Sequence, residues 1–202
     1  RTTSGKRRVL GMLRYYASMA VQIHGETIEN SLPGDYVSYT LKEPVGVVGA
    51  IIPWNGALSA TVWKVGPALA TGCTMVLKPA EETPGIMVAI AALCIEAGLP
   101  AGALNILYGV PGEISSQLIV SPHIRKISFT GSIPVGQQLA VQAGAVTKKI
   151  TLELGGHAPV IVAEDVDVDR VVELTTAAKF RNAGQLCLCP TRFYVHEAVH
   201  DR

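Results

Sequence analysis

Charged residues are scarce in this sequence. They make up 16% of the 202 residues, against 49% for apolar residues, and the formal net charge is only +1. No basic run is present, so the sequence gives no sign of nucleic-acid or anionic-membrane binding. Long apolar runs are missing too: stretches such as 45–53 are broken by glycine and too short to span a bilayer. A composition rich in core residues suits an α/β domain whose sheet is covered on both faces.

Cysteine is equally sparse. The four cysteines are Cys73, Cys94, Cys187 and Cys189, and their spacing fits neither a zinc site nor a disulfide framework. One residue separates Cys187 from Cys189, which is poor geometry for a bridge within a strand or helix. We therefore expect reduced thiols, no metal, and a cytoplasmic or otherwise reducing compartment.

An initiator methionine is also lacking, because the sequence opens at Arg1, and it stops inside an apparent helix start at 195–202. Its length allows one large domain, or one domain and part of another. We expect the sequence to be a segment of a longer protein.

Strand-like and helix-like stretches alternate along the sequence. Expected strands, by their apolar runs, are 35–42, 46–52, 73–77, 104–107, 126–129, 149–153, 159–162 and 192–195. Expected helices, by spacing and by caps such as Thr83-Pro84, are 6–23, 57–70, 84–97, 113–119, 133–142 and 167–180. The rhythm predicts an α/β fold: a doubly wound, mainly parallel, Rossmann-like sheet and the start of a second α/β domain.

Ligands of such sheets bind beyond the carboxyl ends of the strands. Unusual polar motifs stand at these places: Pro53-Trp54-Asn55, Lys78-Pro79-Ala80-Glu81, Phe129-Thr130-Gly131-Ser132, Glu153-Leu154-Gly155-Gly156 and, after the last long helix, Gly184-Gln185-Leu186-Cys187. Each motif is weak alone. In this order, from about Tyr15 to about Glu197, they resemble the aldehyde dehydrogenase superfamily.

The resemblance implies NAD-dependent oxidation of an aldehyde to the acid, through a thiohemiacetal and a thioester. Cys187 would be the nucleophile, since a thiolate attacks carbonyl carbon readily. The Asn55 amide and the Cys187 backbone N–H would stabilise the oxyanion. Residue chemistry alone leaves Cys187 open as a small buried hydrophobe; the other cysteines lack the motif and are expected to pack.

Two charged residues complete the expected catalytic set. Glu153 would be the base that activates water, and it favours hydrolysis, because CoA-acylating relatives do not use it. A solvated strand-end glutamate is the ordinary alternative. Lys64 would orient Glu153 or relay protons, and a snorkelling surface lysine is the open alternative.

Cofactor binding rests on a variant motif, because no Gly-x-Gly-x-x-Gly follows the first strand. Gly131-Ser132 opens a helix whose N–H groups would hold the pyrophosphate, although such a pattern alone is often a mere cap. Lys78 and Glu81 would hold the adenosine ribose, which favours NAD over NADP. Trp54, unless an ordinary buried aromatic, would line the cleft, and the resemblance adds Ile51, Pro53, Leu154 and Gly155.

The substrate side departs from the family pattern. Gly56-Ala57 replaces a bulky aromatic and a proline, and Ala60 is smaller than usual. With Trp63 and Leu186, these positions would line the aldehyde tunnel, and the freed volume suggests a bulky or aromatic aldehyde. His157 is expected to be structural.

The resemblance also divides the sequence. Residues 1–24 would pack on the cofactor domain, 25–44 form part of an oligomerisation arm, 45–153 bind NAD, and 154–202 begin the catalytic domain. The full-length protein would be a homo-oligomer, a dimer or tetramer. An inactive nucleotide-binding or structural segment and a CoA-acylating enzyme remain as alternatives.

Overall fold

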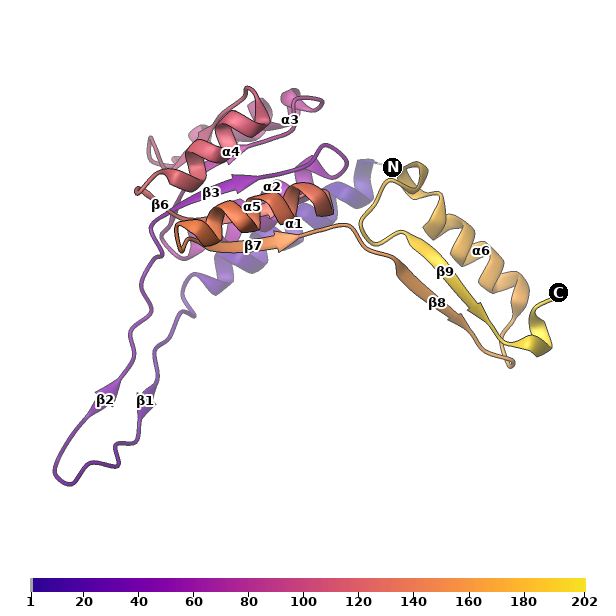
Figure 1. Cartoon of the computed structure of the whole chain (residues 1–202), viewed down its shortest axis with the longest axis horizontal. Helices are drawn as coiled ribbons and strands as arrows, with labels where there is room; N and C mark the ends of the chain where they lie inside the picture. Colours follow the sequence, from indigo (N-terminus) through magenta and orange to yellow (C-terminus); the bar gives the residue numbers. More distant parts are fainter. Residues whose placement is uncertain (1) are drawn as a thin grey trace.

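A parallel sheet forms the centre of the computed structural model, which describes residues 2–202 (Figure 1). Before it come helix α1 (Thr2–Met19) and a thin hairpin of β1 (Thr27–Ile28) and β2 (Ser38–Tyr39), which projects away from the sheet. After it come β8 (Ala158–Val162), α6 (Val168–Lys179) and β9 (Pro190–Val195), which lie to one side. Within the described residues no helix is long and apolar enough to cross a membrane.

The central sheet has five parallel strands in the order β5-β4-β3-β6-β7. They are β3 (Val47–Ile51), β4 (Thr74–Lys78), β5 (Leu104–Ile106), β6 (Ile124–Thr130) and β7 (Lys149–Glu153). The crossovers hold α2 (Ala57–Ala70), α3 (Pro84–Glu96), α4 (Pro111–Val120) and α5 (Ile133–Ala145). The chain runs outward from β3 to β5 and then returns to β6 on the other side of β3. In sheets with such a reversal, ligands bind beyond the carboxyl ends of the strands.

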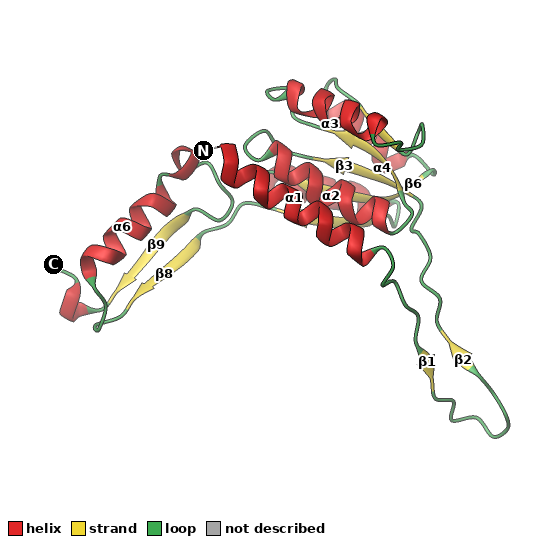
Figure 2. Cartoon of the chain, turned by 180° about the vertical axis from the view of Figure 1, so that it is seen from behind, coloured by secondary structure: helices red, strands yellow, loops and turns green. Residues whose placement is uncertain are grey.

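Helices cover both faces of the sheet, and a hydrophobic core lies between the helices and the sheet on each face. On one face, α2 and α3 pack on the side chains of Ala50, Met75 and Leu77. On the other, α4 and α5 pack on Ile127 and Phe129. Helix α1 lies along the outside of α2 (Figure 2). The doubly wound α/β fold expected from the sequence is therefore confirmed.

The last part of the chain is a second parallel pair. β8 and β9 pair directly, and α6 connects them. Asp167 caps α6, since its carboxylate accepts a hydrogen bond of 3.2 Å from the Arg170 backbone N–H. A short 3₁₀ turn, Arg181–Gly184, links α6 to the loop that carries Cys187.

The structure corrects several predicted bounds. The strand expected at 35–42 is reduced to Ser38–Tyr39, because its partner is only the short β1 and no core lies beneath it. The helix expected at 6–23 is α1, and it ends at Met19, before the chain runs into the β1–β2 hairpin. The helix start expected at 195–202 is a single 3₁₀ turn, Glu197–Val199. Thr83 occupies the N-cap position of α3, but its hydroxyl makes no capping bond.

Candidate active site

The carboxyl ends of β3, β4, β6 and β7 meet at one edge of the sheet. The Ile52 N–H donates to the Lys78 carbonyl at 3.1 Å, which ties the ends of β3 and β4. The Gly131 N–H donates to the Glu153 carbonyl at 3.1 Å, which ties the turn after β6 to β7. The polar motifs predicted from the sequence therefore gather at this edge.

Cys187 reaches this edge from the last part of the chain. The Asn55 side-chain amide donates a hydrogen bond of 2.8 Å to the backbone carbonyl of Gln185, across a sequence separation of 130. A β-carbon placed at Gly156 would lie 3.4 Å from the carbonyl oxygen of Cys187. The loop with the cysteine thus contacts residues that follow β3 and β7, and the Cys187 side chain is exposed.

The turn before Cys187 is held in a left-handed conformation. Asn182, Ala183 and Gly184 have φ angles of 52°, 54° and 78°. For the two residues other than glycine this costs about 1–2 kcal/mol each. Cys189 anchors the other end: it is buried, and its thiol donates to the Lys179 carbonyl at 3.3 Å. Cys189 therefore packs, as predicted, while Cys187 faces outward.

Glu153 and Lys64 lie on the same side of the sheet. Glu153 is the exposed last residue of β7, and α2 places Lys64 over β6. Lys64 is only 8% exposed, so it does not snorkel to the surface, and its amine donates to the Ser128 hydroxyl at 2.7 Å. Burial lowers the pKa of Lys64 to about 8; the nearby charge of Glu153 raises it and that of Lys126 lowers it further.

Sequence reasoning missed Ser128. A usable signal was present, because strict alternation along β6 assigns Lys126, Ser128 and Thr130 to the α2 side, opposite the buried Ile127 and Phe129. A serine at the centre of that row faces the helix that carries Lys64.

Lys78 and Glu81, the two residues predicted to bind the ribose, contact each other. Lys78 is buried at the end of β4, and its amine makes an ion pair of 2.6 Å with Glu81. The hydrogen bond from Lys78 holds the pKa of Glu81 below its usual value. Glu81 is partly exposed and stays ionised near neutral pH, so its oxygens are available to ribose hydroxyls. Trp54, also exposed, follows Pro53 at the end of β3.

The turn from β6 into α5 suits a pyrophosphate. Ser132 is the exposed N-cap residue of α5, and its hydroxyl makes no bond to its own helix. The first N–H groups of a helix lack intrahelical acceptors and attract anions. A side chain at Gly131 would collide with the Phe129 ring, and a β-carbon at Gly136 would approach Leu154 Cδ2 to 2.5 Å. This close turn, the helix start and the acid at Glu81 together fit a dinucleotide.

The other residues predicted for the site lie in different surroundings, some in the hydrophobic cores and some exposed. Ile51 and Ala60 are buried in the two hydrophobic cores, so the Ala60 side chain does not face open space. The position of Gly56 does face open space, since nothing lies within 4 Å of a β-carbon placed there. The Arg8 guanidinium stands over the Trp63 ring, 5.3 Å from its centre. Leu154 packs against the core on the α5 side. Leu186 is half-buried and Gly155 exposed.

His157 is held by the β8–β9 pair. Its Nδ1 lies 2.9 Å from the Thr191 hydroxyl, and its backbone carbonyl accepts a bond of 3.1 Å from Arg192. These contacts agree with the structural role expected for it. Across residues 2–202, no three His, Cys, Asp or Glu side chains are grouped to hold a metal ion.

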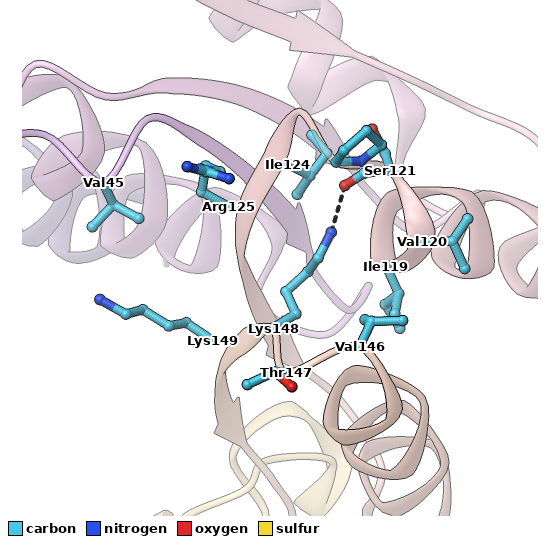
Figure 3. A pocket seen from close by; sticks show the side chains of 11 residues that line it. Val45, Ile119, Val120, Ser121, Ile124, Arg125, Val146, Thr147, Lys148 and Lys149 are labelled. Carbon is cyan, nitrogen blue, oxygen red and sulfur yellow. Dashed lines mark hydrogen bonds between the residues drawn. The ribbon is translucent and has the colours of Figure 1, made fainter.

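A cavity of about 580 Å³ lies at the opposite edge of the sheet, at the start of β6 and β7 (Figure 3). Lys148 projects into it and donates to the carbonyls of Ser121 and Leu118, at 2.6 and 3.3 Å. Those carbonyls belong to the end of α4, where a cation is favoured. The cavity shares no residue with the edge that carries Cys187.

Comparisons with known proteins agree with this geometry. The sequence profile of the Aldehyde dehydrogenase family matches residues 2–202. The chain is 50% identical over 190 residues to the mitochondrial succinate-semialdehyde dehydrogenase of Arabidopsis thaliana, covering 94% of the chain and 36% of that protein. It is 47% identical over 190 residues to the NADP(+) succinate-semialdehyde dehydrogenase GabD of Escherichia coli, covering 94% of the chain and 39% of that protein.

A solved structure shares the fold closely. The salicylaldehyde dehydrogenase of Pseudomonas putida G7, complexed with salicylaldehyde, superposes with a TM-score of 0.93 at 38% identity, covering 98% of this chain and 41% of the other. The chain therefore spans about two fifths of the length of the proteins it matches. With a profile match along residues 2–202, the chain belongs to the aldehyde dehydrogenase family.

Proposed function

We propose that the protein oxidises an aldehyde to its carboxylic acid with NAD, by way of a thiohemiacetal and a thioester on Cys187. One observation carries the proposal: the Asn55 amide, at the end of β3, donates to the backbone of the loop that presents Cys187. That contact brings a neutral hydrogen-bond donor to the place where an oxyanion would form.

The first step joins sulfur to carbon. The Cys187 thiolate attacks the aldehyde carbon, and the carbonyl electron pair moves to oxygen. One amide hydrogen of Asn55 is held by the Gln185 carbonyl, which fixes the plane of the amide. The second hydrogen is then directed by the same plane, and with the Cys187 N–H it stabilises the oxyanion.

The second step oxidises the adduct, and the third releases it. Bound NAD supplies the hydride acceptor. The oxyanion electrons reform the carbonyl as the hydride leaves carbon, which gives a thioester on Cys187. Glu153 then takes a proton from water, hydroxide adds to the thioester, and the carbon–sulfur bond breaks to give the acid and the thiolate. The exposed position of Glu153, just before Gly155-Gly156, supports this role.

NAD is the proposed cofactor rather than NADP. Glu81 is an anion next to the position proposed for the adenosine ribose, and it would repel a 2′-phosphate. The E. coli relative carries NADP(+) in its name, so the family accommodates both. The remaining proposed contacts are Pro53, Trp54, Lys78, Gly131, Ser132 and Gly155, while the side chains of Ile51 and Leu154 pack in the core behind them.

The proposed substrate is a bulky or aromatic aldehyde. The open space at Gly56 supports it, since a side chain there would reduce the room beside Asn55. The salicylaldehyde complex of the Pseudomonas relative shows that this fold admits an aromatic aldehyde. The Arabidopsis and E. coli relatives, whose names give succinate semialdehyde, make a short aldehyde with a carboxylate the second candidate.

The decisive experiment follows NADH absorbance with benzaldehyde and with succinate semialdehyde, each with and without CoA. The proposal expects NADH without CoA, higher kcat/KM for benzaldehyde, and loss of activity in Cys187→Ala. NADH only with CoA would make the protein an acylating enzyme. Folded, NAD-binding protein that oxidises neither aldehyde would favour the inactive nucleotide-binding alternative.

The cellular setting is proposed with the function. The four cysteines are free, which fits a reducing, cytoplasmic compartment. The exposed β1–β2 hairpin supports assembly into a homo-oligomer, a dimer or tetramer, because its apolar side chains lack partners within the described residues. Boundaries at 24, 44 and 153 remain proposals for the domain limits.

A further inference from the structure

Lys64 carries a positive charge in an unusual setting. It lies inside α2, a helix of mostly apolar residues, and its side chain is buried. Among residues 2–202 it makes no ion pair, and its one hydrogen-bond partner is the Ser128 hydroxyl. A buried ammonium without a counter-ion is costly, so burial disfavours the charged form of the Lys64 amine.

The charged groups around Lys64 come from several elements. Lys126 and Ser128 stand on the same face of β6, and the strand register sets Lys149, Thr151 and Glu153 beside them on β7. Glu153 and Lys126 act on Lys64 with opposite sign. From α1, the Arg8 guanidinium lies over Trp63, the residue before Lys64. Within the described residues, Glu153 is the carboxylate that acts on the Lys64 amine and Lys126 is the cation.

A hydroxyl is a special partner for such an amine. The Ser128 oxygen accepts a hydrogen bond from the charged amine, and its O–H donates to the amine when that is neutral. A carboxylate would favour only the charged state, and an alanine would satisfy neither. Serine therefore keeps the amine in one place whether or not it carries the extra proton.

We propose that Ser128 is a positioning residue for the hydrolysis step: its hydroxyl holds the Lys64 amine within electrostatic reach of Glu153 in both protonation states. Lys64 then exchanges a proton near neutral pH while Glu153 acts as base. The inference rests on the function proposed above for Glu153. It needs no new reactant, since the proton that Glu153 takes from water is returned to solvent.

The direct test titrates Lys64 by the NMR signal of its Cε in intact protein labelled with ¹³C-lysine, assigned with Lys64→Met. Ser128→Ala should lower the midpoint by about one pH unit, because the hydrogen bond to the charged amine is stronger than the bond to the neutral amine and both are lost. Ser128→Asp should raise it by at least as much, and Ser128→Thr should leave it in place. An unchanged midpoint in both Ser128→Ala and Ser128→Asp would overturn the proposal.

A second readout separates positioning from folding. The pH dependence of thioester hydrolysis should shift with the Lys64 midpoint in Ser128→Ala and return in Ser128→Thr, with unchanged KM for NAD. Hydrolysis that keeps its pH profile while the midpoint moves would overturn the link to Glu153. If no aldehyde is oxidised, a shifted midpoint still supports the Ser128–Lys64 pair, and the proposed reaction alone fails.

Discussion

In the proposed cofactor site, Glu81 is the side chain that would set the choice of cofactor. Its carboxylate is held by Lys78 at 2.6 Å and is partly exposed. We predict that Glu81→Gln lowers kcat/KM for NAD by about tenfold and narrows the preference over NADP, since a ribose contact to an anion is lost and the repulsion of a 2′-phosphate removed.

The neighbouring Glu82→Gln is the matched control for this change. Glu82 is exposed, carries the same charge, and has no ion pair within residues 2–202. It should leave both cofactors unaffected. Steady-state kinetics with each cofactor measure the outcome, and an equal response to the two substitutions would show that Glu81 has no specific ribose contact.

Lys64 makes stability depend on pH. Its pKa is about 8 in the folded chain against 10.5 when unperturbed, chiefly because of burial. The unfolded chain therefore binds more protons between these values, and stability rises with pH through that window. From pH 7 to pH 9.5 the free energy of unfolding should rise by about 2 kcal/mol through Lys64.

Lys64→Met isolates this contribution. The variant lacks the titrating amine but keeps a chain of similar length, so its stability should lack the rise. Urea unfolding of both proteins at the two pH values gives the comparison. Parallel changes in the two proteins would contradict the burial of a titrating Lys64.

Helix α5 packs unusually close to the end of β7. A β-carbon at Gly136 would lie 2.5 Å from Leu154 Cδ2, whereas one at Gly144, in the same helix, meets nothing within 4 Å. Gly136→Ala should lower the stability by about 1–3 kcal/mol, through overpacking. Gly144→Ala should leave it unchanged or raise it by up to about 1 kcal/mol. Thermal unfolding decides, and equal effects of the two would refute the close contact.

Elements with a strong local signal are predictable from the sequence. The sequence predicts α2 to the residue, Ala57–Ala70, because apolar spacing and Gly72 mark the helix. It also predicts β7 to the residue, Lys149–Glu153. The strand at 35–42 is mostly absent, because its pattern needs a partner that the two-residue β1 does not supply. Strand length depends on pairing, which local sequence does not contain.

The candidate site also has residues that the sequence predicts and contacts that only the fold determines. Motifs at strand ends predict Asn55 and Glu153, because the carboxyl edge of a parallel sheet collects them, and the motif after the last long helix predicts Cys187. The bond from Asn55 to Gln185 joins residues 130 apart and depends on the fold as a whole. Ala60 illustrates the reverse: the family resemblance places it in the wall of the aldehyde tunnel, yet the rotation of α2 turns it into the core.

The β1–β2 hairpin is the part of the molecule with least support. It projects from the sheet (Figure 1). Its apolar side chains are exposed, Val37 and Tyr39 among them. An isolated hairpin is marginally stable in water, so we expect a second copy of the protein to cover it. Val37→Glu with Tyr39→Glu should convert the oligomer to smaller species in sedimentation velocity.

A single glutamate added elsewhere controls for the general effect of a charge on an exposed apolar position. Val88 is exposed on α3, far along the chain from the hairpin, and Val88→Glu should keep the assembly of the unmodified protein. If the hairpin variant sediments like the unmodified protein, or if both variants dissociate, the hairpin is not the assembly surface.

The most direct test of the whole account is the fate of the acyl group in Glu153→Gln. In the proposed reaction Cys187 and Glu153 act in separate steps, so this variant should release about one NADH per active site in a burst and then stop. Mass spectrometry of the quenched protein should find the acyl group as a thioester on the peptide that holds Cys187. A burst without that adduct, or sustained turnover in Glu153→Gln, would contradict the roles of both residues.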